Sequence, residues 1–171
     1  MNKFSRILIV ASLVLFGAPA LMAAEKNWKP PAYKMYAQTL SDEIMAKHPE
    51  LLSVTFHGAP PGLSKVYTMF AGSFPDRIGN ADDPDDVMVV ELGITIIDPR
   101  WNRPKDAIKK FVMMLPLRDA GGGHIGLLVL AYKNPPGSGK TEMDFFAASS
   151  KVRDDLQKKI PTYAGLYAPA K

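Results

Sequence analysis

The stretch that decides the fold is FVMMLPLRDAGGGHIGLLVL, residues 111–130. It consists of two apolar runs separated by a polar, glycine-rich link. The runs predict strands over Lys109–Leu117 and His124–Tyr132. The link Arg118–Gly123 has hairpin length, and its glycines can adopt the positive φ that tight turns require. The stretch therefore predicts two adjacent antiparallel strands.

Three further strands are predicted upstream. Leu52–His57 alternates apolar and polar residues, which is typical of a half-buried strand. The chain turns at Gly58–Gly62, and a strand is predicted over Lys65–Ala71 with Lys65, Tyr67 and Met69 on one face. A short strand is predicted at Ile94–Ile97.

Helical spacing of apolar residues predicts an amphipathic helix from about residue 32 to 47 and another over about 141–160. A short helix is expected between the aspartates at 82–86 and Gly93, because acidic residues and proline favour a helix start and glycine an end. Five strands with hairpin-length links predict an α+β domain. Its five-stranded antiparallel sheet is flanked by the long N-terminal helix and the C-terminal helix.

The first 24 residues have the composition of an export signal. Lys3 and Arg6 precede the apolar run Ile7–Phe16, and small residues follow near Ala23 and Ala24. We expect cleavage there, a bacterial periplasmic location and one domain over residues 25–171, with its core at about 32–133. The alternative is that the segment is kept as an N-terminal anchor.

The composition of the 171-residue chain bounds its class. Hydrophobic residues make up 47%, the net charge is +4, and there is no cysteine. These values exclude a disordered chain, a coiled coil and a multi-span membrane protein. The modest charge gives no reason to expect nucleic acid as a partner, and the fold cannot rely on disulfides in an oxidising compartment.

The predicted order of elements, with the stretch Phe111–Leu130, resembles PAS-like sensory domains and in particular the extracytoplasmic Cache branch. In that family a strand ending in Pro-Leu-x-Asp, a glycine-rich turn and an Ile-Gly strand start recur, as at Pro116–Asp119 and Ile125-Gly126 here. The resemblance covers about Ala32–Lys133. It implies a five-stranded sheet that holds a small molecule between sheet and loops. No second membrane span or output module is found, so signalling would need a membrane-bound signalling or transport partner.

Candidate ligand-binding residues come chiefly from the first predicted strand. Alternation places Ser53, Thr55 and His57 opposite Val54 and Phe56, and a row of hydroxyls and an imidazole suits a small polar ligand. The alternative is that His57 ends the strand and bonds the Gly58–Gly62 turn. The remaining candidates lie on mixed strand faces or in loops: Tyr67, Met69, Arg77, Trp101, Met113 and Arg118.

Two other patterns predict no ligand site. Asp82, Asp83, Asp85 and Asp86 could attract calcium, but they lack the spacing of a calcium loop and fit a helix start. The segment Gly137–Thr141 lacks the first glycine of a phosphate-binding loop.

The leading hypothesis is a periplasmic PAS/Cache-like module, not an enzyme, that binds a small polar or anionic organic ligand for sensing or carriage and needs no cofactor. The first alternative is an exported haem- or metal-binding protein using His57 or His124 with methionine ligands. The second is a ligand-free interaction domain presenting Trp101 to a partner.

Overall fold

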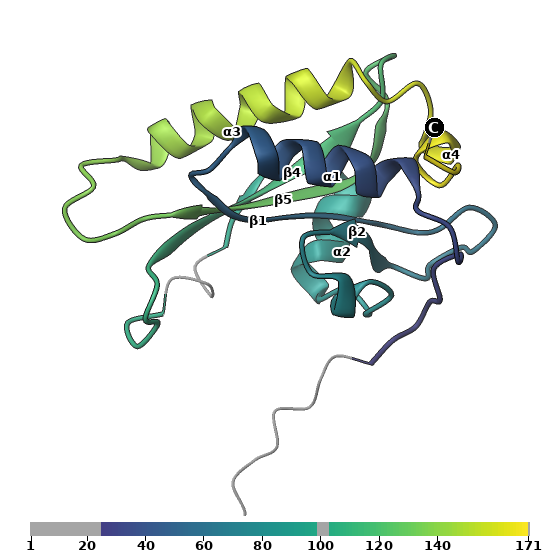
Figure 1. Ribbon diagram of the computed structural model, residues 1–171, viewed down its shortest axis with the longest axis horizontal. Coiled ribbons are helices and arrows are strands. Elements are labelled where there is room, and N and C mark those ends of the chain that lie inside the picture. Colours follow the sequence, from purple (N-terminus) through teal and green to yellow (C-terminus); the bar gives the residue numbers. More distant parts are fainter. Residues whose placement is uncertain (1–24, 99–102, 171) are drawn as a thin grey trace, which may run out of the picture.

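A computed structural model of the chain describes residues 25–98 and 103–170. It confirms the predicted α+β class, with one five-stranded antiparallel sheet in the order β2-β1-β5-β4-β3 (Figure 1). The expected export signal and Trp101 lie outside the described residues. The strands are β1 (Leu51–Gly58), β2 (Thr68–Gly72), β3 (Ile96–Ile97), β4 (Lys110–Arg118) and β5 (His124–Lys133). The helices are α1 (Tyr36–Lys47), the 3-10 turn η1 (Pro75–Arg77), α2 (Pro84–Leu92), α3 (Glu142–Gln157) and α4 (Tyr163–Leu166).

The predicted hairpin is formed by β4 and β5. Its strands pair antiparallel from Lys110↔Lys133 to Arg118↔His124. The turn is closed by Asp119, whose side chain accepts a hydrogen bond from the Gly123 N–H at 2.9 Å, while Gly122 has a φ of 84°. Local turn chemistry thus holds the two central strands together.

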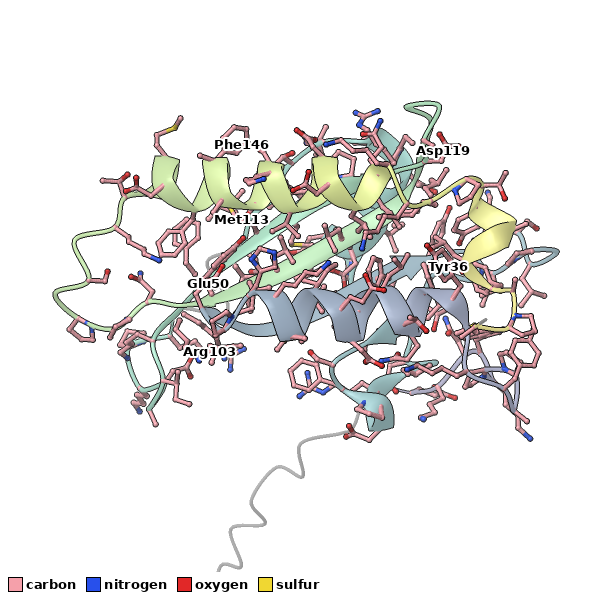
Figure 2. The ribbon with its side chains drawn as sticks, turned by 45° about the horizontal axis from the view of Figure 1, so that its top comes forward. Tyr36, Glu50, Arg103, Met113, Asp119 and Phe146 are labelled. Carbon is pink, nitrogen blue, oxygen red and sulfur yellow. The ribbon has the colours of Figure 1, made fainter. Side chains whose placement is uncertain are left out.

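Helices α1 and α3 cover one face of the sheet, which we call the first face (Figure 1). Val54 and Phe56 of β1 point to this face and belong to its fully buried core. Phe111 and Phe145 stack with ring centroids 4.4 Å apart and join β4 to α3. In Figure 2, Phe146 projects from the outward side of α3, whereas Met113 lies beneath the helix. The alternation of β1 and the stripe on α3 therefore assemble the main core, as expected from the sequence.

Helix α2 covers part of the opposite face, the second face. Val89 of α2 packs there against Met114 of β4 and Leu127 of β5. The helix begins as predicted, with Asp83 as N-cap and a reciprocal capping box with Asp86, and it ends at Gly93 with a φ of 65°. This start places two carboxylates above the second face of the sheet.

The strand predicted over Lys65–Ala71 is wrong at its N-terminal end. Lys65 has a φ of 61°, and regular pairing with β1 begins only at Thr68. A non-glycine residue with positive φ belongs to a turn, so Tyr67 lies in the connection before β2.

The helix boundaries also differ from the prediction. Helix α1 starts at Tyr36, not at residue 32, and α3 ends at Gln157, not at 160. The elements η1 and α4 were not predicted because each spans only three or four residues.

The C-terminal segment is joined to the start of α1. The N-cap of α1, Met35, offers no side-chain hydrogen bond, and the Tyr36 N–H donates instead to the Ala168 carbonyl at 2.8 Å. The Ala170 N–H donates in turn to the Lys34 carbonyl at 2.8 Å. We call this pairing the terminal clasp. None of the helices described in residues 25–98 and 103–170 has the length and apolar character to cross a bilayer.

Candidate functional site

The polar row of β1 lies on the second face of the sheet. Ser53, Thr55 and His57 are each about 8% exposed, and they pair with residues of β5 on that face. The neighbouring strands place apolar side chains there, such as Met114 and Leu127. Three polar side chains in this row are therefore a departure from an ordinary core, where unpaired polar groups cost free energy.

His57 is held by hydrogen bonds at both ring nitrogens. Its Nε2 lies 2.7 Å from the Thr55 hydroxyl, two residues earlier on the same strand face. Its Nδ1 lies 2.7 Å from Oδ1 of Asp82, which comes from the segment between β2 and α2. Both nitrogens are engaged within this cluster, so the alternative that His57 bonds the Gly58–Gly62 turn is wrong.

Asp82 is positioned by backbone contacts of the segment that precedes α2. Its N–H donates to the Tyr67 carbonyl at 3.1 Å, and the next residue, Asp83, caps α2. The Asp82 side chain is fully shielded from solvent. Its second oxygen, Oδ2, has no hydrogen-bond partner within the described parts of the chain.

The charges of this cluster oppose the effect of burial. Burial acts to lower the pKa of His57, but the carboxylate of Asp82, with those of Asp86 and Asp83, outweighs it and raises the pKa of His57 above its usual value. Burial also raises the pKa of Asp86, against the attraction of His57. The carboxylates therefore stabilise the charged form of His57 relative to an isolated histidine.

His57, Asp82 and Asp86 form a compact group of ligand-type side chains. One ligand atom from each of the three residues lies within 4.8 Å of the other two. We call these three residues the His–Asp cluster. One imidazole and two carboxylates are groups that proteins use to bind divalent cations.

Thr55, His57 and Asp82 are hydrogen-bonded in series, as are the hydroxyl, imidazole and carboxylate of a catalytic triad. That chemistry requires a neutral imidazole that accepts the hydroxyl proton. Here the neighbouring carboxylates raise the pKa of His57, which disfavours the neutral imidazole relative to an isolated histidine. Thr55 is also buried, and its methyl group lies close to Gly72 of the neighbouring strand.

Met69 is the predicted site residue that the structure brings beside this row. It pairs directly with His57 across β1 and β2, and it is 5% exposed. A Cβ built on Gly72 would lie 2.8 Å from its terminal methyl carbon and 2.9 Å from the Thr55 methyl group. The absence of a side chain at Gly72 thus lets Met69 and Thr55 approach each other.

The other predicted site residues lie elsewhere. Met113 is fully buried in the core of the first face, so it lies on the wrong side of the sheet. Tyr67 donates its hydroxyl proton to Glu91 at 2.6 Å.

The two described candidate arginines are also engaged away from the row. Arg77 lies over the Phe74 ring at 4.7 Å, and Arg118 donates to the Gly122 carbonyl at 3.1 Å in the β4–β5 turn. These two predicted ligand-binding residues therefore make their described contacts away from the polar row.

Sequence reasoning missed Asp82 and Asp86 as partners of His57. The signal was present as four aspartates within five residues, which were interpreted as a helix start. Asp83 and Asp86 do form the capping box, so that interpretation is confirmed. Asp86 serves both the helix and the cluster.

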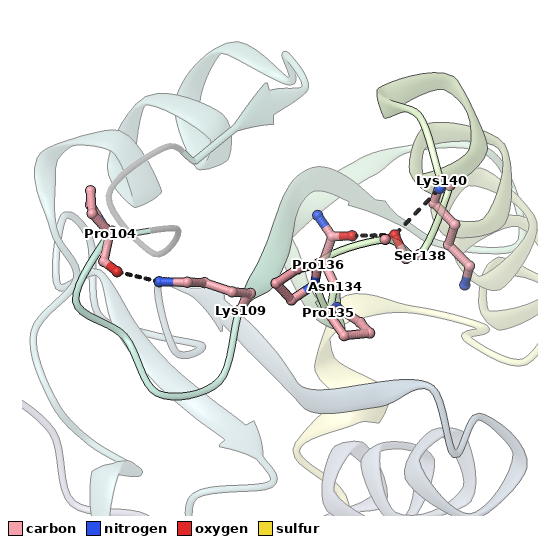
Figure 3. A pocket seen from close by; sticks show the side chains of 9 residues that line it. Pro104, Lys109, Asn134, Pro135, Pro136, Ser138 and Lys140 are labelled. Carbon is pink, nitrogen blue, oxygen red and sulfur yellow. Dashed lines mark hydrogen bonds between the residues drawn. The ribbon is translucent and has the colours of Figure 1, made fainter.

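A separate hollow of about 510 Å³ lies between the loops around Pro104 and Pro136 (Figure 3). Lys109 donates to the Pro104 carbonyl on one side, and Ser138 donates to Asn134 at 2.8 Å on the other. Asn134 follows the end of β5, about 20 Å along the sheet from the residue that pairs with His57. The hollow is therefore distinct from the polar row.

Comparisons with known proteins give only distant similarity. No protein-family model matches the chain, and no curated protein matches it. Among solved structures, the chain is similar to a GAF domain of a two-component sensor histidine kinase from Bacillus halodurans, with 12% identity and a TM-score of 0.49. That match covers 71% of this chain and 91% of the GAF domain.

Two more structures show the same kind of likeness. A type II free methionine-R-sulfoxide reductase from Thermoplasma acidophilum has 16% identity and a TM-score of 0.44, over 71% of this chain and 86% of that one. The E. coli DcuS sensor domain has 14% identity and a TM-score of 0.39, over 70% and 71%. At these values the similarities carry no argument about ligand or activity. The α+β class rests on the five-stranded antiparallel sheet and its helices themselves.

Proposed function

We propose that this protein is an exported, single-domain binding module that holds a small polar ligand at the second face of its sheet. The observation that carries the proposal is the buried row of Ser53, Thr55 and His57. Aliphatic side chains at these positions would bury the same face without the cost of dehydrating hydroxyls and an imidazole. Binding of a polar ligand would account for these buried polar groups, because a few precisely placed polar groups fix the orientation of a ligand.

The charge of the surroundings narrows the ligand class. Asp82, Asp83 and Asp86 outnumber the single imidazolium of His57, whereas Arg77 and Arg118 are engaged elsewhere. Carboxylates attract cations and hydrogen-bond donors and repel anions. We therefore favour a cationic or neutral donor ligand, and the anionic class expected from the loop arginines loses its support.

Binding, not catalysis, is the proposed role. The hydroxyl nearest to His57 belongs to a buried threonine, and the surrounding carboxylates raise the pKa of His57, which disfavours the neutral imidazole that a general base requires. The proposed location is the periplasm, which is supported by the signal-like composition of residues 1–24, and a membrane-bound signalling or transport partner would receive the ligand or its signal.

The proposal is tested by thermal-shift screening of residues 25–171 against amines, amino acids, nucleobases and organic acids. Thr55→Val keeps the shape of the side chain but removes the hydroxyl that meets His57. Thr95→Val makes the same change at an exposed loop position and is the matched control. We expect at least one cationic or neutral compound to raise the melting temperatures of the native protein and of Thr95→Val. The same compound should not raise the melting temperature of Thr55→Val. Stabilisation that persists in Thr55→Val, or none from any compound, would refute the proposed site.

A further inference from the structure

We propose that the His–Asp cluster is a binding site for a divalent first-row transition-metal ion, with zinc as the reference ion. His57, Asp82 and Asp86 each offer one ligand atom, and these atoms lie within 4.8 Å of one another. The inference deepens the proposed function and rests on it in part, because it names a cation as a ligand held at the same face of the sheet. The following observations carry it.

The first is the unpartnered oxygen of Asp82. This side chain is fully shielded from solvent, and its Oδ2 accepts no hydrogen bond within the described residues. A buried carboxylate oxygen without a partner loses its hydration and gains nothing in exchange. Such atoms are rare in folded proteins and often mark the place of a water or an ion. A cation coordinated by Asp82 would compensate for the lost hydration.

The second is the way His57 is oriented. A metal-binding histidine commonly uses one ring nitrogen as ligand, while the other donates to a nearby oxygen that fixes the ring. Nε2 of His57 already has such a partner in the Thr55 hydroxyl at 2.7 Å. This arrangement leaves Nδ1, which faces Asp82, as the ligand atom.

The third is the hydrogen-bonded proton between His57 and Asp82, which a bound cation would have to replace. In the empty site, one proton lies between Nδ1 of His57 and Oδ1 of Asp82, which are 2.7 Å apart. Zinc takes nitrogen and oxygen ligands at roughly 2.0–2.2 Å, so two tetrahedral ligands lie about 3.4 Å apart. The cation would replace the proton, which passes to solvent, and the two side chains would separate by about 0.7 Å. The ligand atom of Asp86, which lies within 4.8 Å of the other two, would approach them by up to about 1.4 Å.

The donor set selects the class of ion. Imidazole suits zinc, iron, nickel and copper, whereas calcium and magnesium prefer six or more oxygen ligands. The three side chains provide one nitrogen and two carboxylates, which leaves an open position as in sites that keep a water or an exogenous ligand. Methionine ligands are not needed, in contrast to the metal-site alternative formulated from the sequence.

The test uses tag-free residues 25–171, stripped of metal and titrated with zinc chloride by isothermal calorimetry. We expect one zinc ion per chain and, at 100-fold over the dissociation constant, a rise of about 5–10 °C in melting temperature. Cobalt(II) in place of zinc should give visible absorption bands that report the ligand geometry. Calcium and magnesium chloride should produce neither effect.

Variants assign the ligands. His57→Gln should abolish stoichiometric binding, and Asp86→Asn should weaken it at least tenfold while changing the cobalt spectrum. Asp86→Asn removes a partly buried charge without removing the His57–Asp82 pair, so it keeps the test valid where His57→Gln does not fold by circular dichroism. The control is His48→Gln, because His48 forms a half-exposed pair with Glu50 at 3.0 Å and is not part of the His–Asp cluster. The His48→Gln variant should bind zinc as the native protein does.

The outcomes separate this inference from the proposed function. No stoichiometric zinc binding, unchanged binding in Asp86→Asn, or a preference for calcium would overturn the cation site. In that case, an organic compound that still stabilises the metal-free protein through Thr55 would leave the binding-module proposal standing. Zinc binding without any organic ligand would confirm the cation site and refute the organic-ligand class.

Discussion

Gly126 controls how closely β5 approaches the site strand β1. A Cβ built at this position would lie 2.5 Å from the His57 carbonyl oxygen, and the residue has a φ of 154°. A carbon and an oxygen in ordinary contact are about 3.4 Å apart. Gly126→Ala therefore requires a backbone movement of about 0.9 Å at His57, in addition to a backbone conformation that L-residues rarely adopt.

The loss of stability in Gly126→Ala follows from the backbone strain and from the displacement of β5 relative to β1. The conformational strain costs about 1–2 kcal/mol, and weakening one or two ladder hydrogen bonds between β1 and β5 costs about 0.5–1.5 kcal/mol each. We expect Gly126→Ala to lower the free energy of unfolding by about 2–4 kcal/mol. The melting temperature should fall by about 2–4 °C for each kcal/mol in a domain of this size.

The assay is urea unfolding of residues 25–171 at neutral pH, with Gly137→Ala as the matched control. Gly137 also has a positive φ, 77°, but a Cβ there meets no atom within 4 Å. The control therefore measures strain without the clash, at about 1 kcal/mol. If Gly126→Ala costs no more than Gly137→Ala, close approach of β5 to His57 does not contribute to stability and the reasoning is refuted.

Three further predictions concern α3 and the export signal. Thr141→Ala should lower the free energy of unfolding by about 1 kcal/mol, because the Thr141 hydroxyl accepts a hydrogen bond from the Asp144 N–H at the helix start. Asp155→Asn should lower stability at pH 5–7 but not at pH 2 or below, because hydrogen bonds from Lys151 and Lys158 lower the pKa of Asp155 to about 2. That carboxylate contributes above its unfolded pKa near 4, and its contribution disappears as the pH falls through about 2. Expression of the full chain in a bacterium should yield a periplasmic protein beginning near Glu25, measured by mass spectrometry.

Each of these three predictions can be contradicted by a specific result. For Thr141, urea unfolding with the same midpoint as the native protein would show that the cap does not stabilise α3. For Asp155, a stability difference that stays constant from pH 7 to pH 2 would exclude the carboxylate as its source. An intact N-terminus in the membrane fraction would favour the anchor over the cleaved signal.

The sequence was informative where structure depends on local interactions. The β4–β5 hairpin was predictable because its turn residues and apolar runs adjoin each other, and α2 because aspartates and Gly93 mark its two ends. The strand at Lys65 was mispredicted because alternation of residue types does not reveal the positive φ there. Pairing with β1, not residue type, decides where β2 begins.

The candidate site was predictable in part for the same reason. Thr55 and His57 are two residues apart on one strand, so their proximity follows from the strand period. Asp82 reaches His57 across 25 residues, and that contact depends on the return of the chain after β2. Met113 was misplaced because alternation shows which residues share a face, but not which face a helix covers.

The terminal clasp has a consequence for the order of events in folding. The Tyr36 N–H in the first turn of α1 obtains its backbone partner from Ala168, which lies 168 − 36 = 132 residues later in the sequence. This hydrogen bond therefore forms only once Ala168 has reached the start of α1. A contact of such long sequence separation slows folding. The start of α1 therefore closes only after segments from both ends of the described chain have come together.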